Sequence, residues 1–217
     1  MSTTNRTKKL ATLAMLATMA YVVMYFLRIP LWSFLKYDPK DIILVITGFI
    51  YGPLSACLVT FIVCIIEMFN ASDTGIIGMI MNILSSCSFA CTAAFIYQKM
   101  HTKRGAVIGL ITGIAVMVPV MLLWNYLITP LYMEMTRENV AAMLLPIFLP
   151  FNLFKGGLNM AFTLLLYKPI ITALRRANLL PKSEGSSGGK ISLGIVFLAL
   201  TIICSIALIV LVNKGII

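Results

Sequence analysis

Residues 41–69 read DIILVITGFIYGPLSACLVTFIVCIIEMF, and this stretch decides the fold. As one α-helix it would measure about 43 Å, whereas the hydrocarbon core of a bilayer is roughly 30 Å thick. Gly52-Pro53 divides the stretch, because proline interrupts a helix and glycine permits a turn. We therefore predict two short helices here, tilted in the membrane or shielded by neighbouring helices.

The distribution of basic residues favours the same division. With two helices in 41–69, the basic groups at 6–9, 99–104 and 168–190 all lie on one side of a membrane. With one helix, the group at 99–104 would lie on the opposite side. Since cytoplasmic loops carry the excess of Lys and Arg, we expect two helices and a cytoplasmic N-terminus.

The composition indicates an integral membrane protein with the lipid bilayer as its surroundings. Of the 217 residues, 60% are hydrophobic and 11% are charged, against about 45–50% apolar and 25% charged residues in soluble domains. The formal net charge of +10 resides in short stretches beside apolar runs. A nucleic-acid-binding protein would instead carry a basic face on a soluble module, so we expect no nucleic-acid partner.

We predict an all-α membrane protein with a core of six transmembrane helices and one extra C-terminal transmembrane helix. Residues 1–176 form the six-helix domain, residues 177–190 a flexible Ser/Gly-rich linker, and residues 191–214 the additional helix. The first apolar run is too long for a signal peptide. Outside 41–69, the predicted helices are 9–27, 75–98, 106–128, 143–173 and 191–212.

Two connections are expected on the outer side of the membrane. Residues 28–40 and 129–139 are predicted to be loops, which makes Arg28 and Lys40 loop residues. The first of these loops contains Leu35, Tyr37 and Asp38 and is rich in aromatic side chains. Such a loop is suited to closing over a flat ring system, although aromatic residues also gather at membrane interfaces without binding a ligand.

Ionisable and amide groups inside the predicted helices are the candidate functional residues, because they are costly in hydrocarbon. Spacings of three and seven residues place Asn152, Lys155 and Asn159 on one helix face. Either this face binds a ligand with several hydrogen-bonding groups that is neutral or has a partial negative charge, or Lys155 reaches the headgroups and the amides join helices. The full set is Glu67, Asn82, Asn125, Asn152, Lys155 and Asn159.

The other candidates keep similar alternatives open. Asn82 heads a polar stripe that is either a ligand contact or a helix contact, and Glu67 either pairs with a cation or reaches the interface. Asn125-Tyr126 lies near the outer end of its helix, at a depth similar to that of Asn152.

The sequence lacks residues for catalysis within the membrane. It has one histidine, and Glu67 is the one carboxylate that we expect inside the membrane. These residues do not supply paired carboxylates, a metal site or a nucleophile with its base. The five cysteines lie in apolar runs without a C-x-x-C pair, and we interpret them as small residues between helices. We expect no enzyme activity, no cofactor and no metal site.

Small residues recur along the first predicted helix. Ala14, Ala17 and Thr18 belong to this series, and small residues allow helices to approach closely. The series is either an internal contact or a docking surface for another subunit.

Four segments carry a resemblance to a known family: KYDPKD at 36–41, GFIYGP at 48–53, Asn125-Tyr126 with TPLY at 129–132, and LPFNLFKGGLN at 149–159. With these segments, residues 8–176 resemble the substrate-binding (S) subunits of energy-coupling factor vitamin transporters, and most closely the riboflavin-specific branch. The resemblance implies a six-helix protein of a prokaryotic cell membrane that binds riboflavin as a transported ligand. It also implies a transmembrane coupling subunit and two ATPase subunits as partners, and toppling of the S subunit in the bilayer during transport.

The resemblance assigns roles to individual residues. Amides and a lysine that contact the flavin ring or the ribityl chain correspond to Asn125, Asn152 and Lys155, and the loop that closes the site contains Leu35, Tyr37 and Asp38. With the polar positions above, the expected substrate-binding set is Asn125, Asn152, Lys155, Asn82, Asn159, Leu35, Tyr37, Asp38 and Tyr126.

In this family, an Ala-x-x-x-Ala pair on the first helix docks onto the coupling subunit. Here the corresponding pair is Ala14 and Thr18, so a threonine replaces the second alanine. The expected docking residues are Ala14, Ala17 and Thr18. The alternatives to a riboflavin subunit are an S subunit for pantothenate, folate or thiamine, and a standalone membrane facilitator.

Overall fold

The computed structural model describes residues 3–32, 35–70 and 74–180, together with residues 196, 200 and 203. The linker predicted at 177–190 and the helix predicted at 191–214 lie almost wholly outside these residues. The elements in order are α1 (Thr3–Leu27), β1 (Ile29–Trp32), β2 (Leu35–Tyr37), α2 (Lys40–Tyr51), α3 (Pro53–Asn70), α4 (Gly75–Met100), α5 (Lys103–Met133), α6 (Arg137–Met143), a π-helical turn (Leu144–Phe148) and α7 (Leu149–Arg176).

Helical stretches suited to a membrane dominate the described chain. Five of them are long and apolar enough to cross a bilayer: Arg6–Leu27, Pro53–Asn70, Gly75–Met100, Lys103–Met133 and Arg137–Arg176. Their outer faces carry large exposed apolar side chains, such as Leu54 with 80% of its surface exposed. A bilayer covers such faces, whereas soluble proteins rarely expose contiguous apolar surface of this extent.

Helix α2 differs from these five. Its 12 residues measure about 18 Å, which is shorter than the hydrocarbon core. Every residue from Lys40 to Phe49 is buried, and α1, α3, α4 and α7 surround the helix. It is a core helix, so the predicted count of six spanning helices is not confirmed.

The predicted division of 41–69 is confirmed. Helix α2 ends at Tyr51 and α3 begins at Pro53. Between them Gly52 adopts a φ of 88°, a left-handed conformation that favours glycine because other residues would crowd their Cβ against the backbone. The chain thereby reverses within one residue.

Both predicted outer loops contain more regular structure than expected. In the first, β1 and β2 form an antiparallel hairpin in which Ile29 pairs with Tyr37. In the second, α5 continues through Pro130 to Met133, so a loop over 129–139 is wrong except at 134–136. Glu134 ends α5 with a φ of 53°, and the Thr136 side chain caps α6 by accepting a hydrogen bond from Asn139 N.

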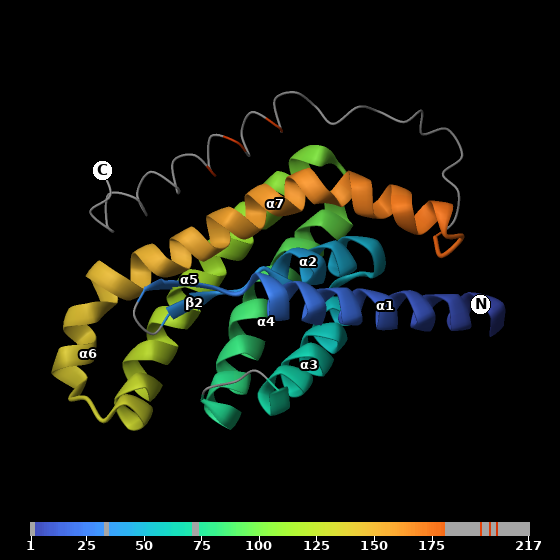
Figure 1. Cartoon of the computed structure of the whole chain (residues 1–217). Coiled ribbons are helices and arrows are strands. Elements are labelled where there is room, and N and C mark those ends of the chain that lie inside the picture. The colour runs from blue at the N-terminus through green and yellow to red at the C-terminus, as the bar shows by residue number, and fades with distance from the viewer. Residues whose placement is uncertain are drawn as a thin grey trace.

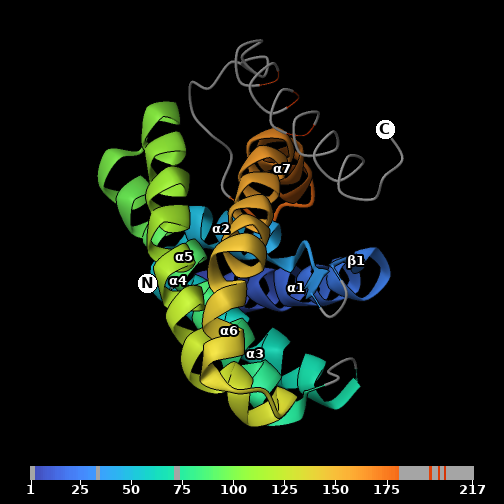
Figure 2. The same ribbon diagram turned by 90° about the vertical axis from the view of Figure 1, so that its left-hand side faces the viewer.

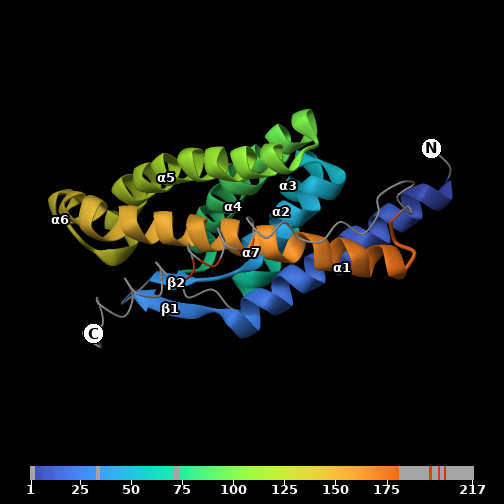
Figure 3. The same ribbon diagram turned by 90° about the horizontal axis from the view of Figure 1, so that it is seen from above.

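The long helices define the shape of the described chain. Helix α7 runs along one side of the bundle (Figure 1), and α6 joins α5 to the start of α7 (Figure 2). The β1–β2 hairpin lies alongside α7 (Figure 3). The first turns of α1 and the last turns of α7 lie at the same end of the molecule in Figures 1 and 3, where Thr12 Oγ1 is 3.5 Å from Leu179 O.

Glycine residues bring α4 and α5 into close contact. A Cβ atom added at Gly109 would lie 2.6 Å from the carbonyl oxygen of Ala93, and one at Gly113 would lie 2.7 Å from that of Phe89. Small residues permit such an approach of two backbones. The contact holds α4 and α5, which carry Asn82 and Asn125, at a fixed separation.

We expect Gly109→Leu to lower the thermal unfolding temperature of the detergent-solubilised protein. The new side chain meets backbone atoms that cannot rotate away, and overpacking of this kind costs about 1–3 kcal/mol. Val116→Leu enlarges a side chain on the exposed face of the same helix and should leave the temperature unchanged. Equal unfolding temperatures for the two variants would contradict the close approach.

Candidate functional site

A cavity of about 360 Å³ lies between the hairpin and helices α3, α4, α5 and α7. Its volume falls within the range of about 300–1,000 Å³ that small-molecule sites occupy. Its polar lining residues are Arg28, Lys36, Asp38, Glu67, Thr74, Asn82, Ser85, Asn125, Tyr132, Asn152 and Lys155, and its apolar ones include Leu35, Met81, Met121 and Phe151.

The cavity brings together six of the predicted substrate-binding residues: Leu35, Asp38, Asn82, Asn125, Asn152 and Lys155. The other three do not line it. Tyr37 and Asn159 are buried beside it, and Tyr37 OH donates to Asn159 Oδ1 over 2.9 Å. Tyr126 is 38% exposed on α5.

Glu67 of α3 gathers donors at one end of the cavity. Arg28, just before β1, and Lys40, the first residue of α2, both form ion pairs with its carboxylate. Asn82 Nδ2 also donates to Glu67 Oε1 over 2.9 Å. Of the two alternatives for Glu67, pairing with a cation is therefore correct. Both ends of the hairpin are thereby tied to α3.

Lys40 begins α2 and is therefore not the loop residue that the sequence predicted, whereas Arg28 does lie in the connection between α1 and β1. Lys40 is fully buried, and the Arg28 side chain is 20% exposed. Their pairing with Glu67 compensates the cost of burying charge. Local sequence patterns do not reveal this pairing, because Lys40 and Arg28 are 27 and 39 residues away from Glu67.

Asp38 of the segment between β2 and α2 is one of the residues that line the cavity. Its Oδ2 atom lies 3.4 Å from Lys40 Nζ, and its Oδ1 atom is buried without a hydrogen-bond partner among the described residues. Burial alone would raise the pKa of Asp38, but the positive charges of Lys40, Lys155 and Arg28 outweigh burial and lower it. The carboxylate therefore stays ionised and can accept a hydrogen bond from a ligand.

Lys155 of α7 points into the bundle. Its Nζ atom lies 3.3 Å from Asp41 Oδ2 and donates to Ser85 Oγ over 3.2 Å. The alternative in which Lys155 reaches the headgroups is wrong. Asp41, fully buried at the start of α2, also accepts hydrogen bonds from Ser86 and Asn159. The sequence predicted Glu67 as the one carboxylate inside the membrane. Asp41 is a second buried carboxylate, so that expectation is wrong.

Tyr37 supports this arrangement from the hairpin. Burial raises the pKa of the Tyr37 hydroxyl, and the carboxylates of Asp41 and Asp38 raise it further. The hydroxyl therefore remains a donor to Asn159, whose amide in turn donates to Asp41 over 3.1 Å. The chain of hydrogen bonds links β2, α7 and α2.

Two further amides, from α5 and α7, line the cavity. Asn125 Nδ2 donates to Met121 O over 2.7 Å, and Asn152 Nδ2 donates to Phe148 O over 2.8 Å. Each amide is thus held by the carbonyl four residues earlier in its own chain segment. Phe148 closes a π-helical turn that contains Pro146, and such turns often occur at functional sites.

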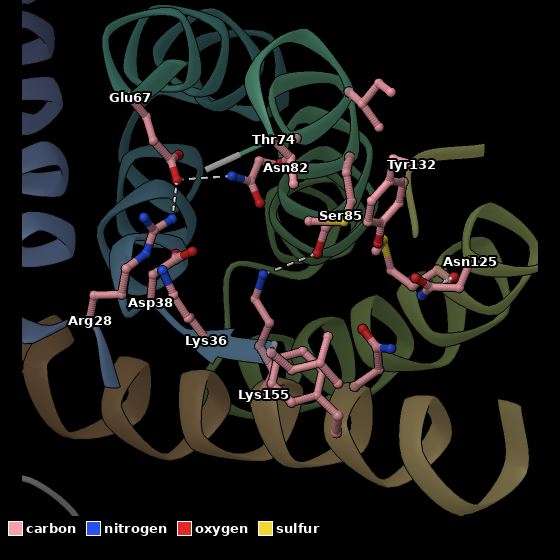
Figure 4. A pocket seen from close by; sticks show the side chains of 17 residues that line it. Arg28, Lys36, Asp38, Glu67, Thr74, Asn82, Ser85, Asn125, Tyr132 and Lys155 are labelled. Carbon is pink, nitrogen blue, oxygen red and sulfur yellow. Dashed lines mark hydrogen bonds and ion pairs between the residues drawn. The ribbon is translucent and has the colours of Figure 1, made fainter. Parts of the chain in front are cut away.

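The close-up of the cavity shows how these groups are distributed. In Figure 4, Arg28, Asp38 and Glu67 lie at one end and Asn125 and Tyr132 at the other, with Lys155 between them. The cavity therefore has a charged end and an amide end. A ligand that spans it meets both donors and acceptors along its length.

The fold is that of a helical membrane protein, with a cavity among its helices that is lined largely by polar side chains. The chain belongs to the family of substrate-specific components of ECF transporters, whose family model matches residues 8–167. The resemblance seen in the sequence is confirmed, and members of this family are transporter components rather than enzymes.

Relatives of known function lie within the same family. The chain is 30% identical over 189 residues to the riboflavin transporter FmnP of Bacillus subtilis (strain 168), a match that covers 80% of this chain and 99% of the relative. It is 28% identical to the riboflavin transporter RibU of Staphylococcus aureus (strain TCH60), covering 78% and 93%.

A solved structure has a similar fold. It is the S component of a bacterial ECF transporter, with 26% sequence identity and a TM-score of 0.67, and the match covers 79% of this chain and 99% of that one.

The predicted docking residues are divided between two faces of α1. Ala14 and Thr18 are exposed, and Thr18 Oγ1 donates to Ala14 O over 3.0 Å. Ala17 lies in the hydrophobic core. A docking role therefore stays a prediction for Ala14 and Thr18. Ala17 could contact a partner only if α1 moved away from the core.

We expect Lys155→Met and Asp41→Asn each to destabilise the protein, because each leaves a buried charge without its partner. Breaking a buried ion pair from one side costs about 3–5 kcal/mol. The double variant should lose less stability than the sum of the single losses, as thermal unfolding in detergent would show. Lys103→Met, at an exposed lysine, is the control. Strictly additive losses would contradict the pairing.

Proposed function

We propose that this chain is the riboflavin-binding subunit of an energy-coupling factor transporter, which takes up the vitamin together with a transmembrane coupling subunit and two ATPase subunits. The observation that carries the proposal is the cavity with an amide end and a carboxylate end. Family membership and relatives named riboflavin transporters support it.

The amide end suits the flavin ring. The outer ring of the isoalloxazine has two carbonyl groups and an N–H between them, and a side-chain amide can both donate to and accept from such a group. Asn125 and Asn152 would supply these bonds. Leu35, Met121 and Phe151 line the same cavity and would contact the faces and edges of the flat ring.

The charged end suits the ribityl chain. A hydroxyl group can donate to a carboxylate such as that of Asp38, which lines this end, and accept from a neighbouring amide or ammonium group. Glu67 and Asn82 line this end as well. Lys155, between the two ends (Figure 4), would reach the junction of ring and chain.

The balance of charges favours a neutral ligand over the alternative vitamins. Arg28, Lys40 and Lys155 form ion pairs with Asp38, Asp41 and Glu67, and the one other charged lining residue in the described chain, Lys36, is exposed. Pantothenate and folate carry carboxylates and thiamine carries a fixed positive charge, so each would add an unbalanced charge to a buried site. Riboflavin adds none.

The remaining parts of the proposal rest on the family. The N-terminus is cytoplasmic in the cell membrane of a prokaryote, the cavity opens to the outside, and the β1–β2 hairpin closes over the bound vitamin. A standalone facilitator would need no ATPase partner, and dependence of uptake on ATP separates the two functions.

We expect Asn125→Ala and Asn152→Ala each to weaken riboflavin binding by tenfold or more in a titration that follows quenching of flavin fluorescence. A lost hydrogen bond to a buried ligand group costs about 1.4 kcal/mol or more, which corresponds to that factor. The unmodified protein should quench the fluorescence tightly and saturably.

Asn70→Ala is the matched control for these two variants. Asn70 also donates its amide to the carbonyl four residues earlier, Ile66 O, over 3.1 Å, but it is exposed at the end of α3. It should bind riboflavin like the unmodified protein. Normal affinity in a folded Asn125→Ala/Asn152→Ala double variant, or no quenching by the unmodified protein, would refute the riboflavin site.

We expect Ala14→Trp and Thr18→Trp to spare riboflavin binding and to impair uptake by cells. Both residues are exposed on α1 and neither lines the cavity, so large side chains there should obstruct a partner rather than the ligand. Val116→Trp on the exposed face of α5 is the control and should transport normally. Normal uptake by the α1 variants would exclude this face as the docking surface.

A further inference from the structure

Three cysteines gather where α3 and α4 pack against each other. Cys57 belongs to α3, and Cys87 and Cys91 belong to α4. Cys57 Sγ and Cys87 Sγ are 3.9 Å apart, and the three sulfur atoms all lie within 4.8 Å of one another. All three are free thiols of intermediate exposure, whereas Cys64 is free but fully buried and lies outside the group.

The separations suit three thiols that share one centre. Bonds from sulfur to a thiophilic centre measure about 2.3 Å, so three sulfur atoms around one centre lie roughly 3.5–4 Å apart. Cys57 and Cys87 already meet this condition. Cys87 and Cys91 are four residues apart and project from the same face of α4. Side-chain rotation can therefore close the remaining gap of about 1 Å.

The group lies on the lipid side of the two helices and apart from the ligand cavity. Leu54, Leu58 and Leu84, on the same two helices, are exposed. None of the three cysteines lines the cavity, whereas Ser85 does. Cys87 is two residues beyond Ser85 and therefore points to the opposite side of α4.

The apolar surroundings select the class of ligand. A zinc or copper ion bound by three thiolates carries a net negative charge, which is costly within hydrocarbon. Trivalent arsenic bound by three thiolates is neutral. It is delivered as arsenous acid, which is also neutral at pH 7 and can reach a site beside lipid.

We propose that Cys57, Cys87 and Cys91 form a binding site for one trivalent arsenic atom. Three S–H bonds and three As–O bonds break, three As–S bonds form, and three water molecules leave. Arsenic remains trivalent and sulfur remains at the oxidation level of a thiol, so no oxidant or reductant takes part. The product joins α3 to α4 through one atom.

The test uses the full chain, reduced and purified in detergent, and incubated with sodium arsenite. After removal of excess reagent, the intact mass should increase by one arsenic atom less three hydrogen atoms, and the free thiol count should fall by three. Maleimide labelling after denaturation, followed by peptide mapping, should find Cys57, Cys87 and Cys91 protected and Cys64 labelled. This result needs no variant.

Single substitutions test the requirement for all three thiols. Cys57→Ala, Cys87→Ala and Cys91→Ala should each reduce retained arsenic at least tenfold after dialysis, because a two-thiol adduct leaves one exchangeable As–O bond. Cys64→Ala is the matched control and should retain arsenic like the unmodified protein. Retention by Cys87→Ala, or an unchanged thiol count in the unmodified protein, would overturn the proposal.

Discussion

The balance of buried charge is the constraint on which the rest of this structure depends. Three cations and three carboxylates lie in or beside the core, and five of the six are almost completely buried. An unpaired charge there would cost several kcal/mol. Each of these charged residues must therefore stay close to its partner, which fixes the backbone segments that carry the two residues. Through these pairs the hairpin, α2, α3 and α7 become one unit.

The same pairs shape the cavity. Glu67 holds Arg28 and Lys40 at the two ends of the hairpin, and Asp41 holds Lys155 across from α2. These side chains also line or adjoin the cavity. The ion pairs that stabilise the fold therefore also form the charged end of the cavity. Movement of the hairpin away from α3 would separate these ion pairs, so the position of the hairpin depends on Glu67.

The sequence predicted the parts that local chemistry controls. Hydropathy indicated the membrane class, Gly52-Pro53 marked the turn, and helical spacing placed Asn152 and Lys155 on one buried face. It left open whether the short helix α2 is tilted in the membrane or shielded by neighbouring helices, because hydropathy does not distinguish a lipid-facing surface from a protein interior. It missed the hairpin and the partners of Glu67, because those contacts join residues distant in sequence and depend on the folded arrangement.

Charge balance also bears on transport itself. If the subunit reorients in the bilayer with its ligand, as the family resemblance implies, every uncompensated charge in the core would do work against the membrane potential, about 2.3 kcal/mol per charge at 100 mV. Among the described residues, the buried carboxylates Asp38, Asp41 and Glu67 are paired with Lys40, Lys155 and the partly exposed Arg28, which reduces this cost in the core. The pairing that stabilises the fold would thus also reduce the electrical work of such a movement.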